Sequence, residues 1–373
     1  MKIALVHDGL FTRGGAERVL LNFQKAFPEA PIYTTVYHKN NTYPEFKNSK
    51  IITTWFNLIA LNEFLFKILF FPFGILAARS INLKDYDVIL CSTTHCGKYF
   101  KARKDALVIN YCYTPFRLAW NPNSYNLSNN IILKFFLSLV INILKKIDYK
   151  YAQRANYYIA MTEETSLRIK ECYNHNGEIE IINPSIDTRQ FISSSYIKNY
   201  FLVVSRLEKY KMVDLVIDVF NELNLPLVII GSGTLENQLK KKSNKNIKFY
   251  KNLSDNRLKK YYSEARALIF PQYEDYGLTV LESYASGRPA ICFDGGGSKY
   301  TGVPLGKNND SKATMLTFKK QSNEELKRAV LNFNSDIFNS ENIKKHSKKF
   351  DDLIFIKKIQ DFIRDKSQQH YDR

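Results

Sequence analysis

The fold is constrained most by one stretch of the sequence, FPQYEDYGLTVLESYASGRPAICFDGGG, in which a strand, a loop, a helix and another strand follow one another. The apolar run 267–270 is typical of a buried strand. A short helix fits 278–286, because Gly287 follows it and Pro289 lies just beyond. The apolar run 289–293 gives the second strand. This order predicts a parallel sheet, which binds its ligands at the carboxyl ends of the strands.

Two carboxylates mark this unit. Glu274 lies in the loop after the first strand, and Glu282 lies eight residues later on the helix. The backbone N–H groups at the helix start, around 276–279, suit a phosphate. A carboxylate beside a phosphate is costly unless neutral groups donate hydrogen bonds to it, and sugar or ribose hydroxyls are the obvious donors. The alternative for either residue is a solvated glutamate on a surface helix.

The segment EDYGLTVLESYASGRPAI resembles the E-x7-E motif of retaining, nucleotide-sugar-dependent glycosyltransferases of family 4. The resemblance implies an α/β protein of the GT-B fold, with two Rossmann-like, doubly wound parallel-sheet domains that face a central cleft. It implies that Glu274 contacts the hydroxyls of the donor sugar and that Glu282 holds the ribose. The other donor-binding residues implied around this motif are Tyr276, Gly277, Leu278 and Thr279.

The length and charge of the chain fit this expectation. A chain of 373 residues suits two domains, and we expect one over 1–190, one over 191–349 and a terminal helix over 350–373 that returns to the first domain. The net charge of +18 favours anionic partners, namely nucleotides, nucleic acid or acidic lipids. Five cysteines without a CxxC pair disfavour a disulfide framework or a zinc site and suit a reducing cytosol.

The start of the chain, MKIALVHDG, is predicted to be a buried strand and not a signal peptide. The glycine pair Gly14-Gly15 follows it and precedes a helical pattern, so it leaves backbone N–H groups open to a ligand. The alternative is a simple turn. GGAER resembles the first glycine loop of the same family, which implies contact with the donor phosphate or with the acceptor.

Polar side chains follow two further strands of the first domain. His95 comes after the strand 86–91, and the resemblance implies a place at the reaction centre, although a lone histidine is often structural. The segment YCYTPFRLAW resembles the YxHTPxRxxW stretch of bacterial surface-polysaccharide glycosyltransferases, mannosyltransferases among them. Tyr113 stands where many relatives have histidine, so a proton-transfer role there is in doubt. Arg117 is a candidate anion contact on the acceptor side, or else a surface salt-bridge residue.

In the second domain, two cations follow the apolar strand 200–205. Arg206 and Lys211 lie where a helix start disfavours positive charge, and a bound diphosphate explains both. The same pair neutralises a departing nucleoside diphosphate; the alternative is two exposed cations. The loop of Gly231 and Gly233 is of a nucleotide-binding type. Leu253 is implied by the resemblance to lie beside the base.

Two apolar segments favour a membrane surface. Residues 55–76 contain too many polar and breaking residues for a spanning helix, and 131–144 are too short to span. The helix predicted over 131–154 has a basic end. Both segments suit peripheral attachment to anionic lipid, and the alternative is two buried core helices. The C-terminal helix is expected over 350–363, with a frayed tail after Arg364.

Taken with the resemblance, these features predict a retaining, metal-independent hexosyltransferase without a cofactor. The acceptor is expected to be a saccharide, carried on a polyprenyl diphosphate, at the inner face of the cytoplasmic membrane. GDP-mannose is the favoured donor, with a UDP-linked sugar as the other choice, and nucleic acid is not expected as a partner. The alternatives are a nucleotide-sugar epimerase on the same fold, a basic nucleic-acid-binding protein, or a non-catalytic membrane scaffold that binds nucleotide.

Overall fold

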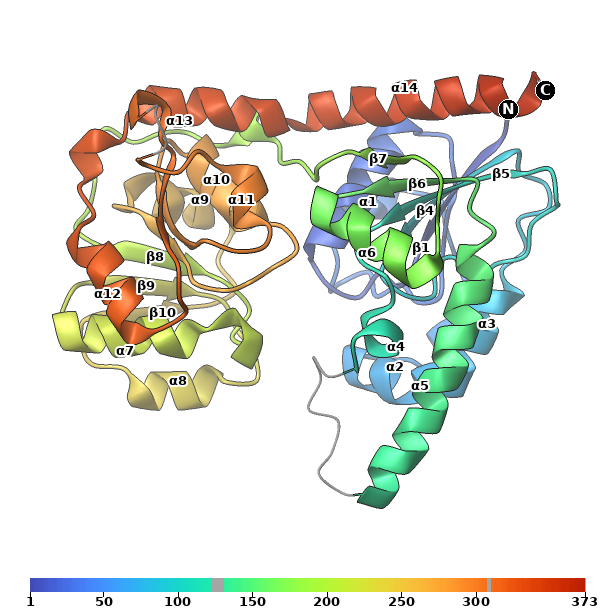
Figure 1. The fold of residues 1–373 in the computed structure, drawn as a ribbon, viewed down its shortest axis with the longest axis horizontal. Coiled ribbons are helices and arrows are strands. Elements are labelled where there is room, and N and C mark those ends of the chain that lie inside the picture. The colour runs from blue at the N-terminus through green and yellow to red at the C-terminus, as the bar shows by residue number, and fades with distance from the viewer. Residues whose placement is uncertain (123–130, 307–309, 373) are drawn as a thin grey trace. The chain divides into compact units, whose positions relative to one another are not determined.

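The computed structural model describes residues 1–122, 131–306 and 310–372 and divides into two compact units. Unit 1 comprises residues 1–184 and 355–373, and unit 2 comprises residues 185–354. Each unit is built around its own parallel sheet (Figure 1). The first boundary, between residues 184 and 185, therefore lies six residues before the predicted one at 190/191.

Unit 1 is organised around a seven-stranded sheet in the order β3-β2-β1-β4-β5-β6-β7, in which neighbouring strands are parallel. The strands are apolar on both faces, as expected for a sheet covered by helices on two sides. Their bounds are β1 Ile3–His7, β2 Ile32–Thr34, β3 Ile51–Thr53, β4 Val88–Thr93, β5 Leu107–Cys112, β6 Tyr157–Ala160 and β7 Ile179–Ile181.

The helices of unit 1 include those formed by the two apolar segments, 55–76 and 131–144, that were expected to lie in a bilayer interface or in the core. The bounds are α1 Gly15–Ala26, α2 Glu63–Leu69, α3 Ile75–Ser80, α4 Arg117–Trp120, α5 Ile131–Ala152, α6 Glu163–Tyr173 and α14 Asp352–Tyr371, which belongs to this unit from Phe355 onward. Pro72 and Gly74 interrupt the apolar segment 55–76, so it forms short helices and turns. α5 packs beside α2 and α3 through one apolar cluster (Figure 1). Among the described residues, no helix has the length and apolar character needed to cross a membrane.

Unit 2 is organised around a six-stranded parallel sheet in the order β10-β9-β8-β11-β12-β13. Its strands are β8 Phe201–Val204, β9 Leu227–Ile230, β10 Ile247–Tyr250, β11 Leu268–Phe270, β12 Ala290–Phe293 and β13 Met315–Phe318. Its helices are α7 Val213–Leu223, α8 Glu236–Lys242, α9 Asp255–Glu264, α10 Leu278–Ala285, α11 Ser298–Thr301, α12 Asn323–Leu331 and α13 Ser340–Ser347. Helices cover both faces of the sheet (Figure 1).

The two sheets share a topological feature that positions ligands. In each, the chain winds outward from a central strand in one direction and then reverses, so that the switch point lies between β1 and β4 in unit 1 and between β8 and β11 in unit 2. Loops that leave adjacent strands on opposite sides of a switch point leave a crevice at the carboxyl edge of the sheet. A ligand site is therefore expected at the loops after these four strands.

Unit 1 is completed by the end of the chain. The Phe355 ring of α14 is buried and stacks on Phe23 of α1, with ring centroids 5.8 Å apart, and it meets the edge of Tyr111 on β5. The expectation of a frayed tail was wrong. α14 continues to Tyr371, whose hydroxyl donates to the Asp87 backbone oxygen at 2.7 Å.

Replacing Phe355 with alanine is expected to destabilise the protein by about 3–5 kcal/mol, because the variant leaves a cavity against Phe23 and Tyr111. Chemical denaturation monitored by circular dichroism measures the loss. Leu353→Ala is the matched control, since Leu353 is exposed on the same helix and its truncation should cost under about 0.5 kcal/mol. Equal losses in the two variants would contradict this packing.

Candidate functional site

The carboxyl edge of the unit 2 sheet carries a partly buried ion pair across the switch point. Lys211 lies after β8 and Glu274 lies after β11, and the lysine ammonium donates to the Glu274 carboxylate. Gln272 donates to the other carboxylate oxygen at 3.1 Å. Lys211 is buried, whereas Glu274 is partly exposed. The lysine charge offsets the charge of the Glu274 carboxylate. Glu274 can therefore lie near a phosphate with less electrostatic repulsion than an unpaired carboxylate would have.

The loop that carries Glu274 is held in place by the glycine run after β12. Gly297 donates its N–H to the Glu274 backbone oxygen at 2.6 Å, and Gly296 has a φ of 65°, which favours glycine. A Cβ on Gly296 would lie 2.4 Å from that same oxygen, and one on Gly297 would lie 2.2 Å from the Tyr276 Cα. Gly296 and Gly297 are therefore required for the position of the Glu274 loop.

Arg206 and Lys211 have different surroundings, although the sequence predicted one role for both. Arg206 is exposed, and its guanidinium donates to the Tyr210 hydroxyl at 2.7 Å. Lys211 is buried against Glu274. Of the two, Arg206 is therefore the cation that solvent and a ligand can reach, while Lys211 reaches a ligand only beside the carboxylate it already contacts.

The remaining predicted donor residues of the E-x7-E segment surround the start of α10. Gly277 is the N-cap of this helix and has no side-chain cap, and Leu278 and Thr279 form its first turn. The Tyr276 side chain is buried, so this residue can contact a ligand only through its backbone. Glu282 is partly exposed one turn further on, where one oxygen accepts from the Tyr262 hydroxyl at 2.7 Å.

The predicted nucleotide-binding loop contains Gly231 and Gly233, and both glycines are required because this loop lies very close to another loop. A Cβ on Gly231 would lie 1.8 Å from the Ser205 backbone oxygen, and one on Gly233 would lie 2.5 Å from the Leu207 backbone oxygen. The loop is thus packed on the segment that carries Arg206. Leu253 lies in the turn between β10 and α9, next to Asn252, which has a left-handed backbone.

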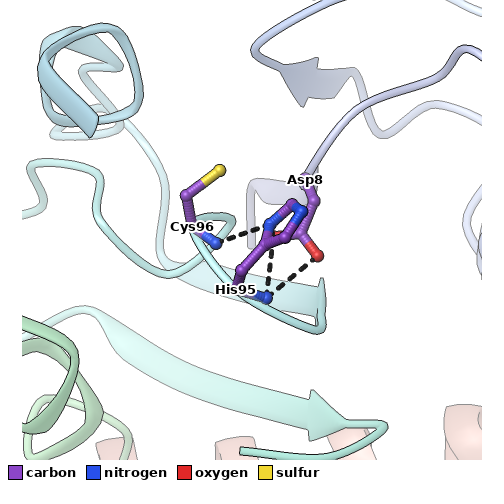
Figure 2. A group of neighbouring side chains, drawn as sticks. All are labelled: Asp8, His95 and Cys96. Atoms are coloured by element: carbon purple, nitrogen blue, oxygen red, sulfur yellow. Dashed lines mark hydrogen bonds and ion pairs between the residues drawn. The ribbon is translucent and has the colours of Figure 1, made fainter. Parts of the chain in front are cut away.

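The switch point of unit 1 carries an Asp–His pair. Asp8 follows β1 and His95 follows β4, and the His95 Nδ1 lies 2.9 Å from an Asp8 oxygen (Figure 2). The Asp8 carboxylate also accepts bonds from the 93–97 loop, which are Thr93 Oγ1 at 3.0 Å, Thr94 N at 2.6 Å, Thr94 Oγ1 at 2.8 Å, His95 N at 3.2 Å and Gly97 N at 2.6 Å. Burial by itself raises the pKa of Asp8, but His95 and these donors outweigh it, so the pKa lies well below its usual range.

The contact with Asp8 fixes which nitrogen of His95 carries the proton. Two groups lie 2.9 Å from Nδ1, namely an Asp8 oxygen, which would accept a proton from it, and the Cys96 N–H, which would donate to it. We assign the proton to Nδ1, because the carboxylate is the stronger hydrogen-bond partner. The other nitrogen, Nε2, is then left for a ligand hydroxyl. Phe66, Phe70 and Phe116 surround the imidazole, with centroids 6.0, 5.3 and 5.7 Å from it.

A metal ion is the other chemistry that this cluster could suggest. Ligand atoms of Asp8, His95 and Cys96 lie within 4.8 Å of one another (Figure 2). However, the Asp8 oxygens are used by the loop donors, and burial raises the pKa of Cys96 well above its ordinary value, which keeps the thiol neutral. A neutral thiol is a poor ligand, so the donor set fits a hydrogen-bonded Asp–His pair better than a metal site.

The other predicted residues of unit 1 lie on both sides of this pair. Tyr113 is buried, and its hydroxyl donates to the Ala16 backbone oxygen at 3.0 Å and contacts Ser92 Oγ, so it supports the start of α1. Arg117 is exposed at the start of α4. Gly14 is the N-cap of α1, Gly15 its first residue, and the buried Glu17 carboxylate lies beside Gly14. This glutamate disfavours a phosphate at the start of α1.

Comparison with known proteins places unit 2 in a family. Residues 187–350 match the family described as Glycosyl transferases group 1. Among solved structures, HepE of Anabaena in complex with UDP-glucose aligns with a TM-score of 0.70 at 14% identity, over 98% of this chain and 100% of that one. The fold is therefore GT-B, as predicted, and residues 187–350 form a group 1 glycosyl transferase domain.

Two curated proteins extend the comparison beyond the fold. O-antigen chain mannosyltransferase C of Escherichia coli is 30% identical over 110 residues, which is 27% of this chain and 30% of that protein. O-antigen chain mannosyltransferase RfbU of Salmonella typhimurium is 22% identical over 266 residues, which is 57% of this chain and 74% of that protein. The predicted resemblance to surface-polysaccharide glycosyltransferases is confirmed. The roles assigned to single residues stay predictions.

Sequence reasoning missed Asp8 and Glu17. The signal for Asp8 was present, because it lies immediately after the first predicted strand, where the rule that selected His95 applies equally. The signal for Glu17 was weaker, since an acidic residue in the first turn of a helix is common. Asp8 lies 87 positions from His95 in the sequence, whereas Glu17 lies close to its partner Thr12, whose hydroxyl donates to it at 2.9 Å.

Asp8→Asn is expected to destabilise the protein by about 3 kcal/mol at neutral pH, because it removes one partner of a buried pair. The folded-state pKa of Asp8 is lowered, so the stability it gives is present above the unfolded pKa of about 3.9 and is lost as pH falls further. Denaturation curves from pH 7 to pH 3 should therefore show a shallower acid decline in the variant. The exposed Asp85→Asn serves as control, and a wild-type slope in Asp8→Asn would refute the assignment.

Proposed function

We propose that this protein is a retaining, metal-independent glycosyltransferase that moves a hexosyl group from a nucleotide sugar to a saccharide in bacterial surface-polysaccharide assembly. The observation that carries the proposal is the Lys211–Glu274 pair at the switch point of a group 1 glycosyl transferase domain. A carboxylate held there can accept hydrogen bonds from sugar hydroxyls, because the lysine balances its charge.

In this proposal unit 2 binds the donor. The exposed Arg206 guanidinium and the amides at the start of α10 bind the diphosphate, and Glu282 accepts from the ribose hydroxyls. As the sugar–phosphate bond breaks, negative charge builds on the leaving diphosphate, and Arg206 and Lys211 are already placed to stabilise it. This is the role that a metal ion would otherwise fill.

In the same proposal unit 1 receives the acceptor. Asp8 holds His95 with Nε2 available, so the imidazole can hydrogen-bond a sugar hydroxyl. Arg117, exposed at the start of α4, suits the diphosphate of a lipid-linked acceptor. Tyr113 was predicted to bind the acceptor too, but its buried hydroxyl gives it a supporting role in our proposal.

Mannose is the sugar we propose, with GDP-mannose as the donor. The two O-antigen mannosyltransferases are the observation that favours it. The complex of HepE with UDP-glucose favours a UDP-linked donor as the second candidate. Nucleic acid is not a proposed partner.

Nucleotide sugars without added metal should raise the melting temperature, and one base should be preferred. A ligand at about 100 times its Kd adds about 2.7 kcal/mol of stability. Arg206→Ala should remove most of this shift, while Lys209→Ala, which deletes a neighbouring exposed cation, should keep it. A panel of nucleoside diphosphates, GDP-mannose and UDP-sugars, with single-stranded DNA as competitor, makes the measurement. Stabilisation by DNA alone would instead favour the nucleic-acid-binding alternative.

We further propose peripheral attachment of unit 1 to the inner face of the cytoplasmic membrane. The side chains that support it are apolar and exposed on neighbouring elements, namely Trp55, Leu58, Phe64, Ile68, Phe73, Leu76, Phe135, Phe136, Leu139 and Ile143. Exposed lysines accompany them on α5 at positions 134, 145, 146 and 150. Apolar anchors beside several cations suit an anionic lipid surface.

Co-sedimentation with anionic liposomes tests this attachment. Changing Phe135 and Phe136 together to serine should lower the bound fraction by about tenfold or more, since each phenyl contributes about 1.5–3 kcal/mol when buried. Leu331→Ser is the control, because Leu331 is equally exposed but lies on α12 of unit 2. Wild-type protein that stays in the supernatant at low salt would rule the attachment out.

A further inference from the structure

Lys98 and Asp148 form a buried ion pair next to the His95 backbone. This pair has no part in the chemistry proposed above. Asp148 of α5 is 0% exposed and Lys98 is 4% exposed, and the ammonium lies 2.6 Å from the Asp148 Oδ1. The carboxylate has four donors. Lys98 and the Tyr99 hydroxyl contact Oδ1, while the Trp120 indole and the Tyr173 hydroxyl contact Oδ2, the last three each at 2.8 Å.

Lys98 also connects this pair to the candidate site. Its ammonium donates to the His95 backbone oxygen at 2.7 Å, while the His95 backbone N–H donates to Asp8. The two peptide groups that flank His95 are thus bound by buried charges of opposite sign. Burial by itself lowers the pKa of Lys98, but the Asp148 charge outweighs it and the pKa is raised, so the lysine is charged.

Stability alone does not require such a pair. Taking two charges out of water is costly, and apolar residues of similar volume in place of a buried ion pair often leave a protein equally stable. A charged hydrogen bond does, however, fix a backbone oxygen more strictly than apolar packing would. Apolar side chains could fill the same space, but they could not orient the peptide group after His95.

We propose that Lys98 and Asp148 are positioning residues that hold His95 in the orientation in which its Nε2 meets the sugar hydroxyl. The expected effect on catalysis rests on the proposed function, whereas the expected effect on the orientation of His95 does not. Asp148 lies on α5, the helix with the exposed Phe135 and Phe136, so the pair also ties that helix to the His95 loop. Neither residue touches a reacting atom in this proposal.

The test is the paired variant Lys98→Met with Asp148→Asn, which removes both charges and leaves neither one unpaired. We expect kcat to fall on the order of 10- to 100-fold with the donor KM unchanged, because misplacement of a reacting group affects the transition state more than ground-state binding. The ring resonances of His95, assigned with His95→Gln, should shift at constant pH. Lys198→Met with Glu264→Gln, which removes a surface pair of unit 2, should change neither value.

A second variant keeps the test decisive if the paired variant folds poorly. Tyr173→Phe removes one bond to Asp148 but retains both charges, so it should lower the melting temperature without changing kcat or the His95 resonances. Wild-type kcat and His95 resonances in a folded paired variant would overturn the proposal, as would a shift in Tyr173→Phe equal to that of the paired variant. Wild-type protein that transfers no sugar would refute the proposed function, while the resonances would still report on positioning.

Discussion

In each unit, one pair of polar side chains bridges the topological switch point of the sheet. In unit 2 the pair is Lys211 with Glu274, and in unit 1 it is His95 with Asp8. Each pair joins the loops after two adjacent strands whose order in the sheet reverses there. The sheet topology brings the two loops together, and the pair then fixes one side chain relative to the other. The glycines at 296 and 297 serve the same end, since they let the backbone approach the Glu274 loop.

Local sequence was sufficient for most of the fold. The unit around Glu274 was predicted closely, because an apolar strand, a helix with a glycine stop and a second strand are encoded by near neighbours. The strand predicted over 200–205 was found for the same reason. The chain end was not: the polar tail suggested fraying, yet α14 continues because its apolar face packs on unit 1 and Tyr371 reaches Asp87. That contact joins residues 284 positions apart, and no local pattern reveals it.

The candidate site was predicted as a set of residues and not as a set of contacts. Arg206 and Lys211 look alike in the sequence, but one is exposed and the other is used by Glu274. Tyr113 looked available to a ligand, whereas its hydroxyl supports α1. Asp8 and His95 are 87 positions apart, so their pairing follows from strand order alone. Residue type and position after a strand identify candidates, while burial decides which of them can meet a ligand.

The course of the chain through unit 1 has a consequence for biosynthesis. The chain leaves this unit at residue 184, builds all of unit 2 and comes back at Phe355. On the ribosome, the first sheet is therefore complete long before the helix that covers Phe23 and Tyr111 has emerged. Until then the nascent chain exposes an apolar surface that α14 covers later. The packing of unit 1 is therefore finished only after translation has passed unit 2.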